Sequence, residues 1–256
     1  MTTTKRMRTH KLMDAALNAR SQMERPRRSI QRLVRLLDLF CCEGGAGMGY
    51  HRAGFNITGV DIEPRKLNPH PVIEADAVEY LLAHGHEYDA IHASPPCQSY
   101  SRSFKHMATP QPMLIDAIRD ALRKVGKPYV IENVAGAPLA NASDLFGNHG
   151  VELCGTMFGL EVYRHRLFET SFPIHAPRPC NHNRHGMNPH NVAGRKRIYE
   201  RHGAGCPEKK WAKAMGVEWM SRDGAREAVP PIFTEYIGRE MMRLCLTNRR
   251  GQRRRR

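Results

Sequence analysis

The sequence predicts an α/β protein with a doubly wound, mostly parallel sheet, and three observations support this fold class. Short apolar runs alternate with helix-forming segments from residue 33 to about residue 171, which is typical of parallel strands joined by helices. A glycine-rich turn at 42–49 follows the first run, and Pro95 and Pro96 end the fourth. Turns of this kind lie at the carboxyl edge of a parallel sheet, where ligands bind.

Each expected strand is a run of aliphatic or aromatic residues that is closed by a turn-forming or acidic residue. In chain order, the expected strands are 32–40, 56–60, 72–75, 88–93 and 128–131, followed by 151–157 and 166–170. The glycine-rich turn opens the first helix, and apolar residues at three- and four-residue spacing indicate the others. These other expected helices are 77–83, 113–125, 211–219 and 231–246.

The composition divides the chain into five regions. Residues 33–171 form the main domain, and the helices within 211–247 return to it. Between them, 172–210 lacks periodicity and is rich in Pro, Gly, His, Asn and Arg, so we expect a short irregular insert. The arm 1–32 and the Arg-rich tail 248–256 are expected to be disordered wholly or in part, because such charged segments bury little apolar surface.

The net charge of +15 is concentrated in three segments. Residues 1–35 carry ten Lys and Arg against two acids and residues 249–256 carry six Arg, so the two ends supply +14. Residues 175–213 carry nine Lys and Arg against two acids, which leaves the rest of the chain net acidic. A basic arm, insert and tail favour a nucleic-acid partner, although the arm and tail alone could be solvated.

Cysteine usage and hydropathy predict the compartment. The seven cysteines have no regular spacing, so they do not indicate a disulfide framework. The apolar runs are short and the first residues are polar and basic, so neither a membrane span nor a signal peptide is expected. We therefore expect a cytoplasmic protein without a membrane contact, and a monomer.

Cys97 is a candidate nucleophile. It follows Pro95 and Pro96, which cannot extend a sheet ladder, so the chain must turn and present Cys97 at the carboxyl edge of the sheet. Taken alone, a single cysteine is more often a small buried hydrophobic residue than a nucleophile. The residues around it in the fold decide between the two interpretations.

The glycine-rich turn indicates a nucleoside-containing cofactor. Glycines let helix amide groups approach a ligand closely, and Asp61, at the end of the second strand, is placed to bind a ribose. Glu43 lies within the turn, and its charge would repel a phosphate. S-adenosylmethionine, which has no phosphate, therefore fits this turn better than a dinucleotide.

Five motifs in this order resemble those of the cytosine-C5 DNA methyltransferases, in particular small phage-type or orphan members. They cover the chain from Leu33 to about Arg243, apart from the insert. The nucleophile and acid motifs together are highly specific. The motifs are Asp38-Leu39-Phe40 with Gly44-Gly45, Pro95-Pro96-Cys97-Gln98, Glu132-Asn133-Val134, Tyr163-Arg164-His165-Arg166 and Ala228-Val229-Pro230-Pro231.

The resemblance implies a Rossmann-like, S-adenosylmethionine-dependent methyltransferase in which 33–171 is the catalytic and cofactor-binding domain and 172–210 the target-recognition region. Cys97 would add to C6 of a cytosine that has left the DNA stack, and Glu132 would protonate N3. Arg166 would hold the cytosine O2, with Arg164 supporting it. The implied cofactor-binding residues are Asp38, Phe40, Gly44, Gly45, Asp61, Ile62, Asp76 and Pro96. The residues assigned to nucleic-acid binding are Gln98, Ser101, Arg195, Lys196 and Arg197.

Three positions depart from the family pattern and leave alternatives open. Cys42 replaces a glycine, Val162 a glutamine and Glu227 an asparagine. Glu227 matters most, because its charge could repel the methionine carboxylate of the cofactor. These departures keep open a catalytically weak nucleic-acid-binding protein that retains the fold. A tRNA cytosine-C5 methyltransferase is a second alternative, because the basic insert does not decide between duplex DNA and folded RNA.

A group of cysteines and histidines in the insert could bind a metal. The group consists of Cys180, His182 and His185, with His175, His190 and Cys206 nearby. Zinc ligands are often spaced two to four residues apart, but no Cys-x-x-Cys pair anchors this group. We therefore expect DNA-contacting or solvated histidines and no metal site.

Overall fold

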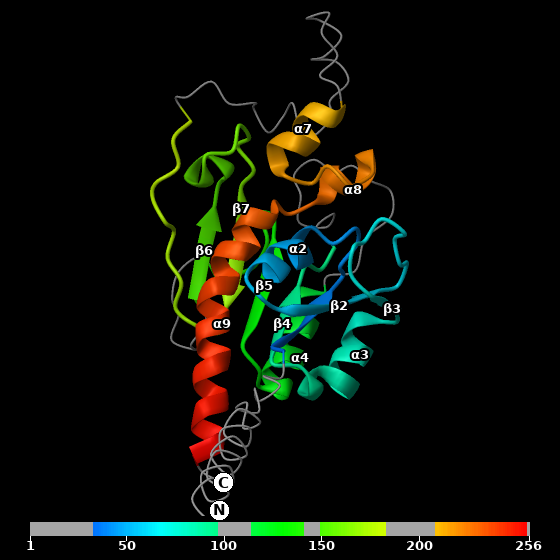
Figure 1. Ribbon diagram of the computed structural model, residues 1–256, viewed down its shortest axis with the longest axis vertical. Helices are drawn as coiled ribbons and strands as arrows, with labels where there is room; N and C mark the ends of the chain where they lie inside the picture. Colours follow the sequence, from blue (N-terminus) through cyan, green and yellow to red (C-terminus); the bar gives the residue numbers. More distant parts are fainter. Residues whose placement is uncertain (1–32, 97–113, 141–148, 183–207, 255–256) are drawn as a thin grey trace, which may run out of the picture. The chain divides into compact units, whose positions relative to one another are not determined.

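The computed structural model describes residues 33–96, 114–140, 149–182 and 208–254 (Figure 1). Within these ranges, seven strands form one sheet in the order β3-β2-β1-β4-β5-β7-β6. All pairs from β3 to β5 are parallel, and β7 is antiparallel to both β5 and β6. The predicted doubly wound, mostly parallel sheet is confirmed. Its strands are β1 (Arg35–Leu39), β2 (Asn56–Asp61), β3 (Val72–Glu74), β4 (Ala90–Ala93), β5 (Tyr129–Asn133), β6 (His149–Leu153) and β7 (Arg166–Thr170).

The strand order places a ligand site between β1 and β4. From β1 the chain moves outward to β2 and β3, then crosses back to β4 and continues outward in the other direction to β5. The connections on the two sides of β1 therefore diverge, which opens a crevice at the carboxyl ends of the central strands. Leu39 ends β1 beside Val60 of β2 and Ala93 of β4, so the residues that follow these strands meet there.

Alternating side chains of the strands supply the two halves of the core. Leu36 faces a cluster that contains Tyr50 and Phe233, whereas Leu37 faces a cluster that contains Leu81 and Ile118. The first cluster is covered by α2 (Gly45–Arg52) and α9 (Pro231–Arg254), and the second by α3 (Ala77–His84) and α4 (Ile115–Val125) (Figure 1). The sheet is thus buried on both faces.

The last helices complete the domain and correct several sequence-based boundaries. α7 (Glu208–Met215) and α8 (Arg222–Glu227) precede α9, and α8 was not predicted. α9 runs to Arg254, so the predicted disordered tail is helical up to that residue. Arg249 in this stretch forms an ion pair with Asp89 at 2.5 Å.

Two further boundaries differ from prediction. The strand predicted at 151–157 ends at Leu153, and a 3₁₀ helix, η3 (Gly155–Phe158), follows it. Phe172 and Ile174 are buried in the core, so the first residues of the predicted insert belong to the main domain. The apolar side chains of Phe172 and Ile174 could have indicated this burial, but the prolines around them suggested a loop.

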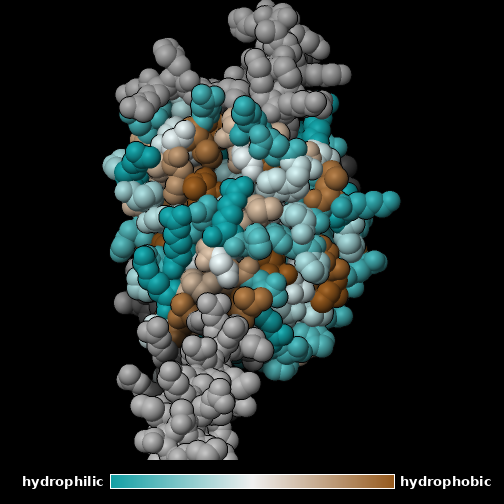
Figure 2. Space-filling model, viewed as in Figure 1, coloured by the Kyte–Doolittle hydropathy of each residue, from teal (hydrophilic) through white to brown (hydrophobic). Residues whose placement is uncertain are grey.

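The visible face in Figure 2 is largely hydrophilic, with small apolar patches. Among the described helices, none combines the length and the apolar character needed to cross a bilayer.

Candidate functional site

A cavity of about 500 Å³ lies at the carboxyl ends of the central strands and is bordered on one side by the segment 220–229. Its volume is within the usual range for small-molecule sites. Nine of the residues predicted for the site line it: Asp38, Phe40, Gly45, Asp61, Ile62, Asp76, Pro96, Glu132 and Arg166.

The other predicted site residues lie elsewhere. Gly44 precedes α2 within the turn, and Arg164 precedes β7 without lining the cavity. The remaining six are outside the described residues, namely Cys97, Gln98, Ser101, Arg195, Lys196 and Arg197.

The glycine-rich turn is built from left-handed backbone. Phe40, Cys42 and Gly44 have φ values of 58°, 46° and 80°. A Cβ on Gly44 would lie 2.7 Å from the amide oxygen of Asn68, so only glycine fits without a shift of the neighbours. Gly44 has no side chain that could cap the first amides of α2, and the amide of Gly47 in this first turn acts on Asp38.

Cys42 occupies a backbone conformation that favours glycine. A cysteine in place of the glycine of the family pattern should therefore lower the free energy of unfolding. Its amide donates to Asp61 Oδ2 at 2.8 Å, and its carbonyl accepts from Asn68 at 3.0 Å. Glycine would keep both backbone bonds and relieve the left-handed strain of about 1–2 kcal/mol, against a backbone-entropy cost of about 0.5–1 kcal/mol.

We expect Cys42→Gly to stabilise the protein by about 0.5–1 kcal/mol, and Cys42→Ala, which keeps a Cβ, to give no comparable gain. Thermal and urea denaturation of the cofactor-free protein would measure both. A glycine variant no more stable than the alanine variant would contradict the strain argument.

Backbone amides hold two predicted cofactor carboxylates at strand ends. Asp61 accepts from Cys42 through Oδ2 and from the Glu63 amide through Oδ1, at 2.8 and 3.1 Å. Asp76 accepts two amides of the first turn of α3 through Oδ1, both at 2.9 Å. Each carboxylate keeps further lone pairs with which it can bind a ligand hydroxyl or amino group.

Ile62 is an apolar residue exposed at the cavity. It follows Asp61, lines the cavity with Phe40, and is 71% exposed, the most exposed of the described large hydrophobic residues. A flat apolar ligand group that covered Ile62 would remove this surface from water and so gain binding free energy.

Glu132 and Arg166 form an ion pair within the cavity. Arg166 Nε lies 2.9 Å from Glu132 Oε1, and the Glu132 side chain is 7% exposed. Burial raises the pKa of Glu132, while the nearby Arg166 and the Ser94 hydroxyl oppose the rise. A buried carboxyl group with a raised pKa can hold a proton for a ligand and still be oriented by its cationic partner.

Two strands position the proline loop beside Glu132. Asn133 Nδ2 donates to the Pro95 carbonyl at 2.8 Å, which ties the end of β5 to the loop that leads to Cys97. From β4, buried His92 bridges Tyr50 and Ser94, with Nδ1 3.0 Å from the Tyr50 hydroxyl and Nε2 2.9 Å from the Ser94 hydroxyl. Burial lowers the pKa of His92 to about 3, so this histidine is neutral. Sequence reasoning missed this bridge.

Arg164 supports the segment that closes the cavity. Its Nη2 donates to the carbonyl oxygens of Arg226 and Ala228 at 2.7 and 2.9 Å. These bonds hold the end of α8 and the Ala-Val-Pro-Pro motif against the main domain. The contacts give Arg164 a positioning role toward this segment, which differs from the predicted support of Arg166.

Glu43 links the glycine-rich turn to α8. Its carboxylate accepts from the Ser221 amide at 2.7 Å and the Ser221 hydroxyl at 2.6 Å, and its carbonyl accepts from Trp219 Nε1 at 3.0 Å. Ser221 in turn caps α8 by accepting from the Gly224 amide at 3.0 Å. Glu43 therefore also holds α8 in place, a structural role that the sequence analysis, which considered only its charge, did not predict.

The charge of the cavity favours a cationic ligand. Burial raises the pKa of Asp38 to about 7, an effect that the Gly47 amide opposes. No described residue forms a hydrogen bond of good geometry with either Asp38 carboxyl oxygen. Only two guanidinium groups of the described residues, Arg65 and Arg166, balance the acids. The acids that line the cavity are Asp38, Glu43, Asp61, Asp76, Glu132 and Glu227.

Comparison with known proteins gives one informative sequence relative. No family model matches the chain. The chain is 31% identical over 121 residues to the type II methyltransferase M.AquIA of Picosynechococcus sp.. The match covers 40% of this chain and 49% of that protein, so the chain spans about half the length of the curated relative.

One of the similar solved structures shares the fold. The S. pombe Dnmt2 methyltransferase superposes with a TM-score of 0.54 at 11% identity, over 83% of this chain and 99% of that one. A putative DNA modification methyltransferase encoded within an E. coli prophage is 22% identical, over 54% of this chain and 46% of that one, with a TM-score of 0.41.

The fold is therefore the Rossmann-like fold of S-adenosylmethionine-dependent methyltransferases. The predicted resemblance to DNA cytosine-C5 methyltransferases is confirmed as a resemblance, in sequence by the type II methyltransferase and in fold by the Dnmt2 structure. These matches imply S-adenosyl-L-methionine as the cofactor. The acidic cavity and its exposed apolar Ile62 fit that group, which carries a sulfonium, an ammonium and an adenine.

Proposed function

We propose that this chain is a DNA (cytosine-5-)-methyltransferase that uses S-adenosylmethionine. The observation that carries the proposal is the buried Glu132–Arg166 ion pair, because it shares one cavity with the glycine-rich turn and with Pro96, the residue before Cys97. A proton donor, an oxyanion partner and a cofactor turn are thus grouped with Pro96, which directly precedes the candidate nucleophile in the sequence. Residues grouped in this way are better suited to catalyse addition to a heterocyclic base than to serve only as part of the packed core.

The cofactor half of the cavity is proposed to hold S-adenosylmethionine, which supplies an electrophilic methyl group when bound. Asp61 would accept hydrogen bonds from the ribose, and Asp76 would accept one from the adenine amino group. Phe40 and Ile62 would contact the adenine ring. Glu227 would repel the methionine carboxylate and attract the ammonium, so its two effects oppose one another.

The catalytic half is proposed to act on a cytosine. The Cys97 thiolate forms a bond to C6, and the electron pair of the C5–C6 double bond shifts to make C5 nucleophilic. Glu132 gives its proton to N3, and Arg166 donates to O2, where charge accumulates. After transfer, loss of the C5 proton re-forms the double bond and releases Cys97 from C6.

Duplex DNA is the proposed substrate, with the target base turned out of the stack so that it reaches the cavity. The basic arm, insert and tail of the sequence support a polyanionic partner, and the motif resemblance favours DNA over tRNA. A cytoplasmic location, a monomeric state, and a phage or restriction-modification context stay predictions of the sequence.

A mechanism-based trap tests the proposal. DNA that contains 5-fluorocytosine has no C5 proton to lose, so the enzyme with S-adenosylmethionine should remain covalently attached to it. We expect a denaturation-resistant adduct with the wild-type chain and none with Cys97→Ser, measured by gel shift and mass spectrometry. An adduct on fluorinated tRNA alone would favour the RNA enzyme. Tight DNA binding without any adduct would favour a binding protein.

A further inference from the structure

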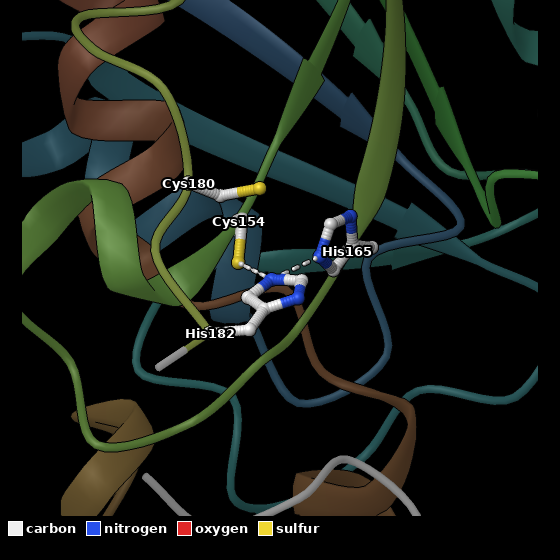
Figure 3. Close-up of side chains that lie close together, drawn as sticks. All are labelled: Cys154, His165, Cys180 and His182. Carbon is white, nitrogen blue, oxygen red and sulfur yellow. Dashed lines mark hydrogen bonds between the residues drawn. The ribbon is translucent and has the colours of Figure 1, made fainter. Parts of the chain in front are cut away.

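Four side chains from three separate segments converge away from the cavity (Figure 3). Cys154 directly follows β6, His165 directly precedes β7, and Cys180 and His182 lie on the irregular segment after β7. One ligand atom from each residue, a thiol sulfur or an imidazole nitrogen, lies within 4.8 Å of all the others. In Figure 3 the Cys154 sulfur and the His165 ring are directed at His182, and the Cys180 sulfur lies nearby.

We propose that this cluster binds a structural zinc ion. Zinc bonds of about 2.3 Å to sulfur and about 2.0–2.1 Å to nitrogen, in tetrahedral geometry, place a sulfur and a nitrogen ligand about 3.5 Å apart and two nitrogen ligands about 3.3 Å apart. Cys154 Sγ lies 3.5 Å from His182 Nε2, and the Nε2 atoms of His165 and His182 lie 3.1 Å apart. These two distances match those between zinc ligands, and the Cys180 sulfur lies within 4.8 Å of the other three ligand atoms.

Hydrogen bonding alone explains only part of this arrangement. The Glu152 carboxylate accepts from His165 Nδ1, so neutral His165 carries its proton there and presents a lone pair at Nε2. His182 could donate to that lone pair, but the two thiols are weak hydrogen-bond groups and would gain little from facing the same point. A divalent cation uses all four donors at once.

The surrounding residues orient the ligands as outer-shell groups do in zinc proteins. Glu152 with His165 forms the carboxylate–histidine pair that fixes the tautomer of a metal-binding imidazole. The Tyr163 hydroxyl donates to the His182 carbonyl at 2.9 Å, and its ring lies 4.7 Å from the imidazole. Thr156 Oγ1 accepts a hydrogen bond at 3.1 Å from the backbone amide of Asn181, which lies between Cys180 and His182 in the sequence.

The ligand set indicates a structural ion. Two thiolates and two neutral imidazoles balance the charge of Zn²⁺ and fill its four positions, which leaves none for substrate. The described residues 171–182 form neither helix nor strand, so a bound ion would tie this segment to the β6–β7 edge. It would also fix the backbone next to Arg166, whose guanidinium contacts Glu132.

The proposal revises the expectation that no metal binds. Sequence spacing hid the site, because ten residues separate Cys154 from His165 and fourteen separate His165 from Cys180. Of the histidines and cysteines predicted to accompany Cys180 and His182, His175 is described and is not part of the cluster. His185, His190 and Cys206 lie outside the described residues.

Metal analysis of the tag-free chain tests the inference. We expect about one zinc per chain after reconstitution and dialysis, and a several-fold loss in Cys180→Ser and in His182→Ala. Cys245→Ser, which changes a buried cysteine of α9 outside the cluster, is the matched control and should retain the metal. Replacement by Co²⁺ in the wild-type chain should give the visible absorption of a tetrahedral thiolate site.

Three outcomes would overturn it. These are a wild-type chain that binds neither zinc nor cobalt, cluster variants that retain as much metal as the control, and a Cys154–Cys180 disulfide found by mass spectrometry in protein kept under reducing conditions. If a cluster variant fails to fold, the cobalt spectrum of the wild-type chain decides. None of these readouts depends on methyl transfer, so the metal site and the proposed function can fail separately.

Discussion

Glu132→Gln is expected to lower kcat by about 10²–10⁴-fold while the chain stays folded and still binds S-adenosylmethionine. Glutamine has nearly the same shape and keeps an oxygen for Arg166, whose Nε lies 2.9 Å from Glu132 Oε1. It cannot give a proton to N3 of cytosine, which in the proposed mechanism becomes basic once the thiolate has added at C6. Because burial raises the pKa of Glu132, the wild-type carboxyl group can hold that proton.

A second buried pair supplies the control for this prediction. Glu169 is 1% exposed and pairs with Arg119 at 2.7 Å, but it lies outside the cavity. Glu169→Gln should lower the unfolding temperature and leave single-turnover methyl transfer at a permissive temperature close to wild type. Equal losses of transfer rate in the two variants, or an unchanged rate in Glu132→Gln, would show that the Glu132 proton is not used.

The sheet could be predicted because its determinants are local. Each central strand is a short apolar run, and the residues closing these runs, such as Asp61, fall at one edge of any parallel sheet. α8 could not be predicted this way. It has six residues with Gly224 among them, and the Glu43 carboxylate that holds its Ser221 cap is 178 positions away in sequence. Distant partners of this kind leave no periodic signal.

The same distinction applies to the sites. The residues that follow strand ends, Asp61, Pro96 and Glu132, are brought to one cavity by topology alone. The cluster around Cys154 required the antiparallel pairing of β6 with β7 and the path of an aperiodic segment. In the tail, the composition predicted disorder, but Arg249 has an acidic partner, Asp89, in the main domain.

Asp38→Asn is expected to stabilise the cofactor-free protein at pH 8 by about 4 kcal/mol, and by about a third of that at pH 5. The folded-state pKa of Asp38 is raised by burial to about 7, so the folded chain binds a proton more tightly than the unfolded chain. The contribution of this proton to the free energy of unfolding is complete below about pH 4 and is lost as the pH rises through about 7. Asparagine is neutral throughout, and chemical denaturation at both pH values would measure the difference.

The same variant is expected to bind S-adenosylmethionine at least about tenfold more weakly at pH 8. The buried Asp38 carboxylate would attract the positive charge of the cofactor, whereas asparagine is neutral. In the wild type, affinity should fall by up to about tenfold per pH unit below 7, with proton release on binding, since the cation favours ionised Asp38. The variant should lose this pH dependence. Calorimetry at pH 6 and 8 measures both effects, and S-adenosylhomocysteine, which lacks the sulfonium charge, should show smaller ones. A stabilised variant that binds the cofactor as well as wild type would mean that the buried carboxyl group of Asp38 does not interact with the bound cation.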